Sequence, residues 1–315
     1  MENIILFDWF SLSSKSDSPR SMLEHLQITD DSVCFSENYG LYGYRNRLEF
    51  GGISIHYNHW SADTEGVLLE MSGQGCRAFE TYSDGNWERL FNLATDTENG
   101  YNVTRLDIAY DDKDGLLDIL KIKKSVEKRN YIARSRVGTI TNSFNGDLDG
   151  ISVMLGSKSS EYYVRFYDKA AERGGLDCHW VRCEQVLKHE RALEFLKLSD
   201  VPIGKRYAGV LRNYLRFVVP NKTESNKSRW NTEKWYDKFL GDCERISLYT
   251  KKDVDYNMHR LEHYLQHQCG NSIETYIKCL GIEGLQEMLS KKTSKLTPEQ
   301  LRLIELYKFE NNIND

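Results

Sequence analysis

The chain has 315 residues, 40% of them hydrophobic and 12% aromatic, which is enough to bury the cores of one main domain and a smaller one. Its net charge of −5 and pI of about 6.0 exclude a uniformly basic surface, so any phosphate binding must come from local basic clusters. The N-terminus lacks signal-peptide features, and no stretch approaches the roughly 20 apolar residues of a membrane span, which predicts a soluble, cytoplasmic protein. Seven cysteines without a CxxC pair indicate free thiols.

The first third of the chain predicts strands followed by a helical region. Residues 48–57 and 66–72 are β-rich and bounded by glycine or asparagine, which is typical of a hairpin or meander. Residues 73–75, Gly-Gln-Gly, are expected to end the second strand in a turn. Large apolar residues then recur at helical spacing over 76–94, with an interruption near Gly85.

The middle of the chain predicts more strands, with one helix among them. Residues 103–110 alternate as a strand does, and Asp114 is expected to cap a helix over 116–129. Residues 150–155 and 161–167 predict a hairpin. Further elements are expected as strands at 180–187 and 215–219 and a helix at 190–197.

The character of the chain changes after residue 220. Residues 221–229 are polar and predict a linker between a main domain at 1–220 and a small helical domain at 230–315. Five helices are expected in the second domain, at 230–243, 256–267, 272–279, 282–290 and 298–309, the last with Thr297 as N-cap and Pro298 at its first position.

Two basic segments stand out in this acidic chain, and each holds seven basic residues against one acid. They are candidates for contacts with a phosphate backbone, although solvated helix faces would look the same. The first basic segment (121–136) contains Lys121, Lys123, Lys124, Lys128, Arg129, Arg134 and Arg136. The second basic segment (205–229) contains Lys205, Arg206, Arg212, Arg216, Lys222, Lys227 and Arg229.

A tyrosine between two cations is the first candidate for catalysis. In a strand at 162–168, Arg165, Tyr167 and Lys169 fall on one face together with Tyr163. A phenol has a pKa near 10, so its attack on a phosphodiester needs neighbouring cations that favour phenolate and neutralise the transition state. The alternative is an amphipathic strand in which these side chains only pack and form hydrogen bonds.

Two acidic residues within apolar strands are candidates for metal binding. Asp107 and Glu184 each follow an arginine by two residues, and carboxylates in such strands need a partner. Oxygen ligands on one concave face suit Mg²⁺ or Mn²⁺. Glu70 is the candidate third ligand and Asp111 competes with it, while two plain arginine–carboxylate ion pairs remain an equal alternative.

Five motifs in order resemble the replication-initiation (Rep_trans) family, which includes rolling-circle plasmid and phage initiators and related conjugative-element relaxases. They are LEMSGQGCR at 69–77, RLDIA at 105–109, LGSK at 155–158, VRFYDK at 164–169 and WVRCE at 180–184. The resemblance covers roughly residues 40–220. It implies an α+β fold, an antiparallel sheet flanked by helices, distantly similar to HUH nucleases but with carboxylates in the metal site.

The resemblance also implies a function. The family nicks one DNA strand at an origin through a tyrosine, forms a 5′-phosphotyrosyl bond, leaves a free 3′-OH for a polymerase and later rejoins the strand. By position the nucleophile corresponds to Tyr167, and Asp107 and Glu184 match the acidic metal-site motifs. The resemblance further suggests a homodimer and a recruited host helicase.

Together these patterns predict a metal-dependent nicking enzyme. Arg165 and Lys169 are expected to hold the phosphate and Lys188 to protonate the leaving oxygen. DNA contacts are expected from the first basic segment, Arg105, Arg182, Lys205 and Arg206. The alternatives are a conjugative-element relaxase with the same chemistry, a non-catalytic sequence-specific DNA-binding regulator, and an RNA-binding module.

Overall fold

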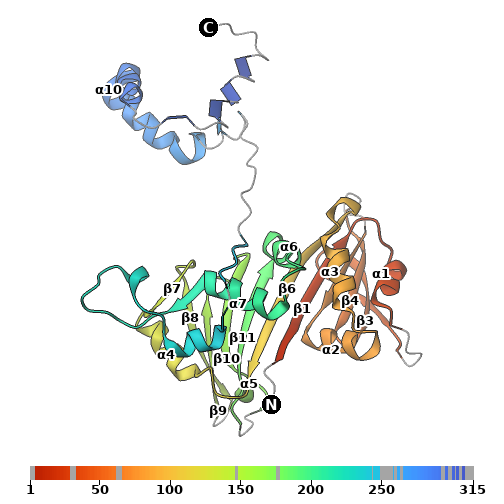
Figure 1. The fold of residues 1–315 in the computed structure, drawn as a ribbon. Helices are drawn as coiled ribbons and strands as arrows, with labels where there is room; N and C mark the ends of the chain where they lie inside the picture. The colour runs from red at the N-terminus through yellow and green to blue at the C-terminus, as the bar shows by residue number, and fades with distance from the viewer. Residues whose placement is uncertain are drawn as a thin grey trace. The chain divides into compact units, whose positions relative to one another are not determined.

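The computed structural model describes residues 4–28, 33–61, 66–145, 148–174, 178–242, 244–248 and parts of the chain beyond 257. Contacts divide the chain into two units, Met1–Thr250 and Lys251–Asp315. In the described part of the first unit, ten strands form one antiparallel sheet (Figure 1). Their order is β2 (Ser36–Tyr39), β3 (Tyr44–Phe50), β4 (Ile53–His59), β5 (Val67–Met71), β1 (Ile4–Ser14), β6 (Tyr101–Asp112), β11 (Val181–Lys188), β10 (Tyr162–Asp168), β9 (Leu148–Leu155) and β8 (Gly138–Asn145).

Helices cover one face of this sheet (Figure 1). The core lies between them and the apolar side of the strands, where Phe10, Leu106, Ile108, Val164 and Phe166 are fully buried. The expected antiparallel sheet flanked by helices is therefore confirmed. The helices of the first unit are α1 (Pro19–Leu26), α2 (Gly73–Tyr82), α3 (Trp87–Thr95), α4 (Ile119–Glu127), α5 (Lys169–Glu172), α6 (Glu190–Leu196), α7 (Ile203–Tyr214) and α8 (Lys234–Leu240), with 3-10 turns η1 (Thr97–Asn99) and η2 (Lys227–Arg229).

Two local expectations differ from the structure, and capping explains both. Residues 73–75 form the first turn of α2 and not a loop, because the Ser72 hydroxyl accepts a hydrogen bond from Gly75 N. A Cβ at Gly75 would lie 2.2 Å from the Gly52 carbonyl oxygen, so the close approach of helix and strand requires glycine there. Helix α4 begins at Ile119, later than expected, because Asp118 accepts from the backbone N–H groups of its first turn.

Residues 221–250 belong to the first unit. Strand β12 (Leu215–Phe217) pairs with β7 (Tyr131–Ala133) in a separate two-stranded sheet. Tyr236 of α8 is fully buried, its hydroxyl donates to the Leu215 carbonyl oxygen at 2.9 Å, and its ring lies 5.2 Å from that of Phe217. Because α8 shares this core, the structure divides the chain after Thr250 and not at the expected polar segment 221–229.

The second unit is helical where it is described. A π-helical turn, η3 (Leu265–Cys269), leads into α10 (Gly270–Ser290). Helix α10 breaks at Gly281 (φ 72°), which matches the expected division between helices at 272–279 and 282–290. Half of each range in which helices are expected at 256–267 and 298–309 falls outside the described residues, as do Thr297 and Pro298. No helix among the described residues is long and apolar enough to cross a membrane.

Candidate active site

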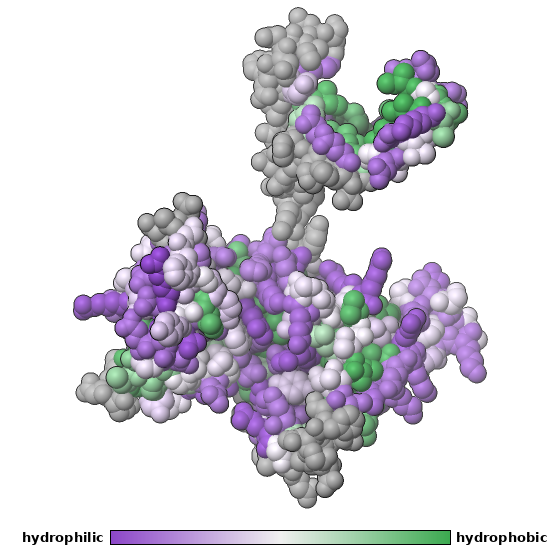
Figure 2. All heavy atoms as spheres, turned by 180° about the vertical axis from the view of Figure 1, so that it is seen from behind, coloured by the Kyte–Doolittle hydropathy of each residue, from purple (hydrophilic) through white to green (hydrophobic). Residues whose placement is uncertain are grey.

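The sheet face opposite the helices is polar. Strand β11 shows why, since Cys183 and Leu187 point into the core under the helices while Arg182 and Glu184 point to the other side. We call this side the open face. Figure 2 views the molecule from the side away from the helices and shows hydrophilic side chains gathered over the middle of it. Charged groups from neighbouring strands therefore meet on the open face.

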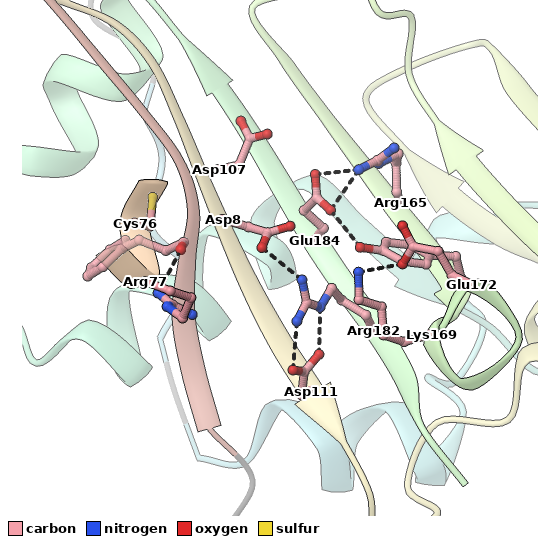
Figure 3. A network of polar contacts seen from close by, with 12 residues as sticks. Asp8, Cys76, Arg77, Asp107, Asp111, Arg165, Lys169, Glu172, Arg182 and Glu184 are labelled. Carbon is pink, nitrogen blue, oxygen red and sulfur yellow. Dashed lines mark hydrogen bonds and ion pairs between the residues drawn. The ribbon is translucent and has the colours of Figure 1, made fainter. Parts of the chain in front are cut away.

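Tyr167 and Glu184 meet at the centre of this face. In the β10–β11 register Arg165 pairs with Glu184, and Tyr167 pairs with Arg182. The Tyr167 hydroxyl donates to Glu184 Oε2 at 3.2 Å. Arg165 Nη2 donates to both Glu184 oxygens at 2.7 Å, as Figure 3 shows. Glu184 is only 1% exposed and Tyr167 8%. The expected tyrosine, arginine and carboxylate thus share one side of the sheet.

Asp107 lies on the next strand, β6, where it pairs with Val186 of β11. Arg105 binds both of its oxygens, through Nε at 2.9 Å and Nη2 at 2.6 Å. Burial raises the pKa of Asp107 to about 7, the charge of Glu184 adds to this effect, and Arg105 opposes it. Two carboxylates therefore face each other closely enough to repel. The arginine–carboxylate pairing expected as the plain alternative is present, but within a larger acidic site.

Cations also flank the Tyr167 ring. Arg165 Cζ lies 5.2 Å and Lys169 Nζ 5.4 Å from the ring centroid. Lys169 opens helix α5, is 5% exposed and forms an ion pair with Glu172. Burial and the Glu184 charge nevertheless hold the pKa of Tyr167 well above its usual value. The two cations alone therefore do not make the phenol acidic, and further positive charge is needed.

A second polar network joins β11, β6 and β1, and the sequence did not predict it. Arg182 binds Asp111 through Nε (2.6 Å) and Nη2 (2.7 Å) and reaches Asp8 through Nη1 at 2.9 Å (Figure 3). Asp8 lies at a register shift in β1. In the sequence it interrupts an apolar run, and that interruption was the signal that could have identified Asp8. Arg182 is 4% exposed, so it holds strands together and is not placed to contact DNA as expected.

Two expected site residues lie apart from this centre. Glu70 is on β5, which β1 separates from β6, and its neighbours are the Tyr42 hydroxyl, Arg105 and Arg47. Burial raises the pKa of Glu70, although Tyr42 donates a hydrogen bond to it. Lys188 donates to the Lys158 carbonyl oxygen and lies four residues, or about 13 Å, along β11 from Glu184. Among the described residues, no third carboxylate, histidine or cysteine completes a metal cluster with the Asp107–Glu184 pair.

Comparison with known proteins identifies the family. The model of the replication initiation factor family (Rep_trans) matches residues 101–290, and that of the rolling circle replication initiation protein N-terminal domain matches residues 4–93. This chain belongs to the replication initiation factor family. Its predicted function, a rolling-circle replication initiator that nicks DNA, is thereby confirmed.

Two relatives of this initiator extend the match over most of its length. The putative DNA relaxase NicK of Bacillus subtilis (strain 168) is 29% identical over 323 residues, covering 96% of this chain and 90% of the relative. The solved structure of the rolling circle replication initiator protein from Geobacillus stearothermophilus is 30% identical, with a TM-score of 0.69, and covers 79% of this chain and 100% of that one.

The two basic segments of the initiator meet in space. Lys227 Nζ donates to the Arg129 carbonyl oxygen at 2.8 Å, across 98 positions of sequence. Arg129, Arg136 and Lys227 line a groove of about 760 Å³ beside β7 and β8. Most of the expected DNA-contacting side chains are exposed or half-exposed, namely Lys121, Lys123, Lys124, Lys128, Arg129, Arg134, Arg136 and Lys205. Arg206 is an exception, as Arg182 is, because it is buried and donates to the carbonyl oxygens of Val201 and Phe195.

Proposed function

We propose that this initiator nicks one DNA strand by attack of the Tyr167 hydroxyl on a phosphodiester. The observation that carries the proposal is the hydrogen bond from that hydroxyl to Glu184, next to two cations. The tyrosine oxygen forms a bond to phosphorus, and the bond from phosphorus to the 3′ oxygen breaks. The phenolic proton passes to Glu184 and water gives a proton to the leaving 3′ oxygen, so the products are a 5′-phosphotyrosyl ester and a 3′-OH.

Arg165 is placed to hold the phosphate. Its Nη2 is committed to Glu184, whereas its Nε–H is buried and has no hydrogen-bond partner in the described part of the chain. A buried donor without a partner costs free energy of folding. That cost is removed where a ligand oxygen accepts the hydrogen bond. Lys169 lies on the other flank of the ring and can add charge when its pair with Glu172 opens. These two residues therefore grip the phosphate that Tyr167 attacks.

We propose that Asp107 and Glu184 hold a Mg²⁺ or Mn²⁺ ion. The donor set fits, because both residues offer only hard carboxylate oxygens and they repel each other without a cation. Hydrogen bonds from Arg105 use two of the roughly four lone pairs of Asp107, and those from Arg165 and Tyr167 use three of the lone pairs of Glu184, so acceptor positions remain. When bound, such an ion polarises the scissile phosphate and stabilises charge on the leaving oxygen. Water and the phosphate would supply its other ligands.

The substrate of this chemistry is the DNA of a replication origin. The basic groove at Arg129, Arg136 and Lys227 is proposed to hold its backbone, with affinity falling as salt rises. A host helicase and a second copy of the chain are proposed partners in strand separation. The similarity to a putative DNA relaxase favours, as the second candidate, the same nicking chemistry used to start conjugative transfer of an element.

The decisive experiment is capture of the covalent intermediate. Single-stranded oligonucleotides tiled across the replicon that encodes the chain are incubated with the full-length protein and Mn²⁺, and adducts that survive denaturation are isolated. Tyr163→Phe is a matched control, because this tyrosine lies two residues away on the same face. We expect an adduct in wild type and Tyr163→Phe and none in Tyr167→Phe. An adduct peptide that maps to another tyrosine, or binding with no adduct, would overturn the proposal, the latter in favour of a regulator.

A further inference from the structure

The loop between β2 and β3 folds over the open face. Leu41 N donates to His56 Nδ1 at 3.3 Å, and the Tyr42 ring meets the His56 ring edge-on at 5.6 Å. His56 is fully buried, and burial together with Arg47 lowers its pKa to about 4, so its imidazole is neutral and can accept this bond. Tyr42 has a φ of 56°, an unfavourable conformation for an aromatic residue. These contacts hold the Tyr42 ring in place against the sheet.

Tyr42 belongs to a solvent-exposed aromatic patch. Its side chain is 61% exposed, and Trp60, at the end of β4, is 69% exposed. Trp60 N donates to the Gly43 carbonyl oxygen at 2.9 Å, which joins the two segments. The Arg45 guanidinium lies over the Trp60 ring, 4.2 Å from its centroid. We call Tyr42, Arg45 and Trp60 the aromatic patch.

The aromatic patch connects to the candidate active site through Glu70. The Tyr42 hydroxyl and the Arg105 charge both lower the pKa of Glu70 against the effect of burial, and Arg105 in turn binds both oxygens of Asp107. Arg105 also stacks on an aromatic ring, that of Trp9, at 4.4 Å. Arginine–aromatic pairs thus occur at three places on the open face: at Tyr167, at Trp9 and at Trp60.

From this arrangement we propose that the aromatic patch stacks unpaired bases of the nicked DNA strand, in a path that runs from Tyr167 across the open face. The inference rests on the proposed function. Rings stack on any base, and guanidinium groups bind both rings and phosphates, which is the chemistry of single-strand binding surfaces. Glu70 lies four strands from Tyr167, or at least about 19 Å at 4.8 Å per strand. That span corresponds to roughly six nucleotides at the 3.4 Å rise of a stacked strand.

The test compares oligonucleotides with different unpaired lengths. Binding of full-length protein is measured by fluorescence anisotropy with oligonucleotides that extend two or ten nucleotides from the nick, separately on the 5′ and the 3′ side. We expect Trp60→Ala and Tyr42→Ala each to weaken binding of one long oligonucleotide by about 5- to 150-fold, the range for loss of one base–aromatic stack. Trp60→Phe should retain most of the affinity. Binding of the oligonucleotides with two-nucleotide extensions should be less affected.

Tyr39→Ala is the matched control. Tyr39 is 93% exposed in the same hairpin, but it pairs with Asn46, whose side chain lies on the face away from Arg45 and Arg47. Unchanged binding in Trp60→Ala, or an equal loss in Tyr39→Ala, would overturn the inference. Equal weakening of binding to duplex DNA would also overturn the inference, because the aromatic patch would then contact double-stranded DNA. The Tyr167 adduct assay on wild type separates this inference from the proposed nicking function. If wild type forms the adduct and Trp60→Ala binds normally, the stacking inference alone is wrong.

Discussion

Replacing Asp107 by asparagine is expected to stabilise the metal-free protein at pH 8 while it abolishes nicking. Asp107 is 2% exposed and faces Glu184, and burial raises its pKa from 3.8 to about 7. The folded state therefore keeps a proton that the unfolded chain releases. Stability falls as pH rises from about 4 to about 7 and then stays low. The asparagine variant lacks this titration, because an amide stays neutral.

The size of the effect follows from the same pKa values. Each pH unit between 3.8 and about 7 is worth about 1.36 kcal/mol, so the gain at pH 8 is on the order of 4 kcal/mol. For a unit of this size, that corresponds to a rise of about 8–16 °C in melting temperature. A residue that weakens the fold yet is needed for activity is typical of functional sites.

Thermal unfolding in EDTA at pH 4.5, 6 and 8 checks this prediction. The difference in melting temperature between Asp107→Asn and wild type should grow with pH. Asp111→Asn serves as the control on the same strand, because Arg182, which binds that carboxylate, has a side chain only 5% exposed, whereas the Arg105 side chain that binds Asp107 is 29% exposed. Removing the Asp111 charge leaves a buried guanidinium without its counter-ion, so this variant should be less stable at every pH. A difference that does not change with pH, or an asparagine variant that melts below wild type at pH 8, would refute the reasoning.

Four further predictions follow from the structure. Mn²⁺ at about 100 times its dissociation constant should stabilise wild type at pH 8 by about 2.7 kcal/mol and Asp107→Asn much less, as calorimetry would show. Arg182→Met should cost about 3–5 kcal/mol in a denaturant titration, since it leaves buried Asp111 unpaired, and Asp111→Asn in the same chain should recover part of the loss. Lys227→Gln should lower the slope of log affinity against log salt for duplex origin DNA by about 0.9 if it contacts one phosphate. Tyr236→Phe should destabilise the first unit by about 1 kcal/mol, because it removes the hydrogen bond to Leu215; no change would question the placement of α8.

Several elements could be predicted because their signals are local. The β9–β10 hairpin and β11 lie where alternation placed them, and the break near Gly85 separates α2 from α3. Strand β1 was not predicted, although it forms the middle of the sheet between β5 and β6. Its apolar run is interrupted by Asp8, and only the bulged pairing with β6 explains that interruption.

The domain boundary could not be read from composition. The polar segment 221–229 resembles a linker, yet Tyr236 beyond it is fully buried against the first unit. A polar stretch and a linker have the same composition, because both are exposed. The core that the following aromatic residues join is decided by their contacts with other elements, such as the contact of α8 with β12. No simple sequence pattern reveals those contacts.

Strand periodicity by itself determined which side chains share a face. Arg165 with Tyr167, Arg105 with Asp107 and Arg182 with Glu184 are set by the two-residue repeat, whatever the strands pair with. Only the tertiary structure decided which strands are neighbours. It placed Glu184 beside Arg165 and Tyr167 and paired Arg182 with Asp111 and Asp8. It also inserted β1 between β5, which carries Glu70, and β6, which carries Asp107. Partner choice across strands depends on sheet order and register, which arise from packing of the whole core and not from the sequence near any one residue.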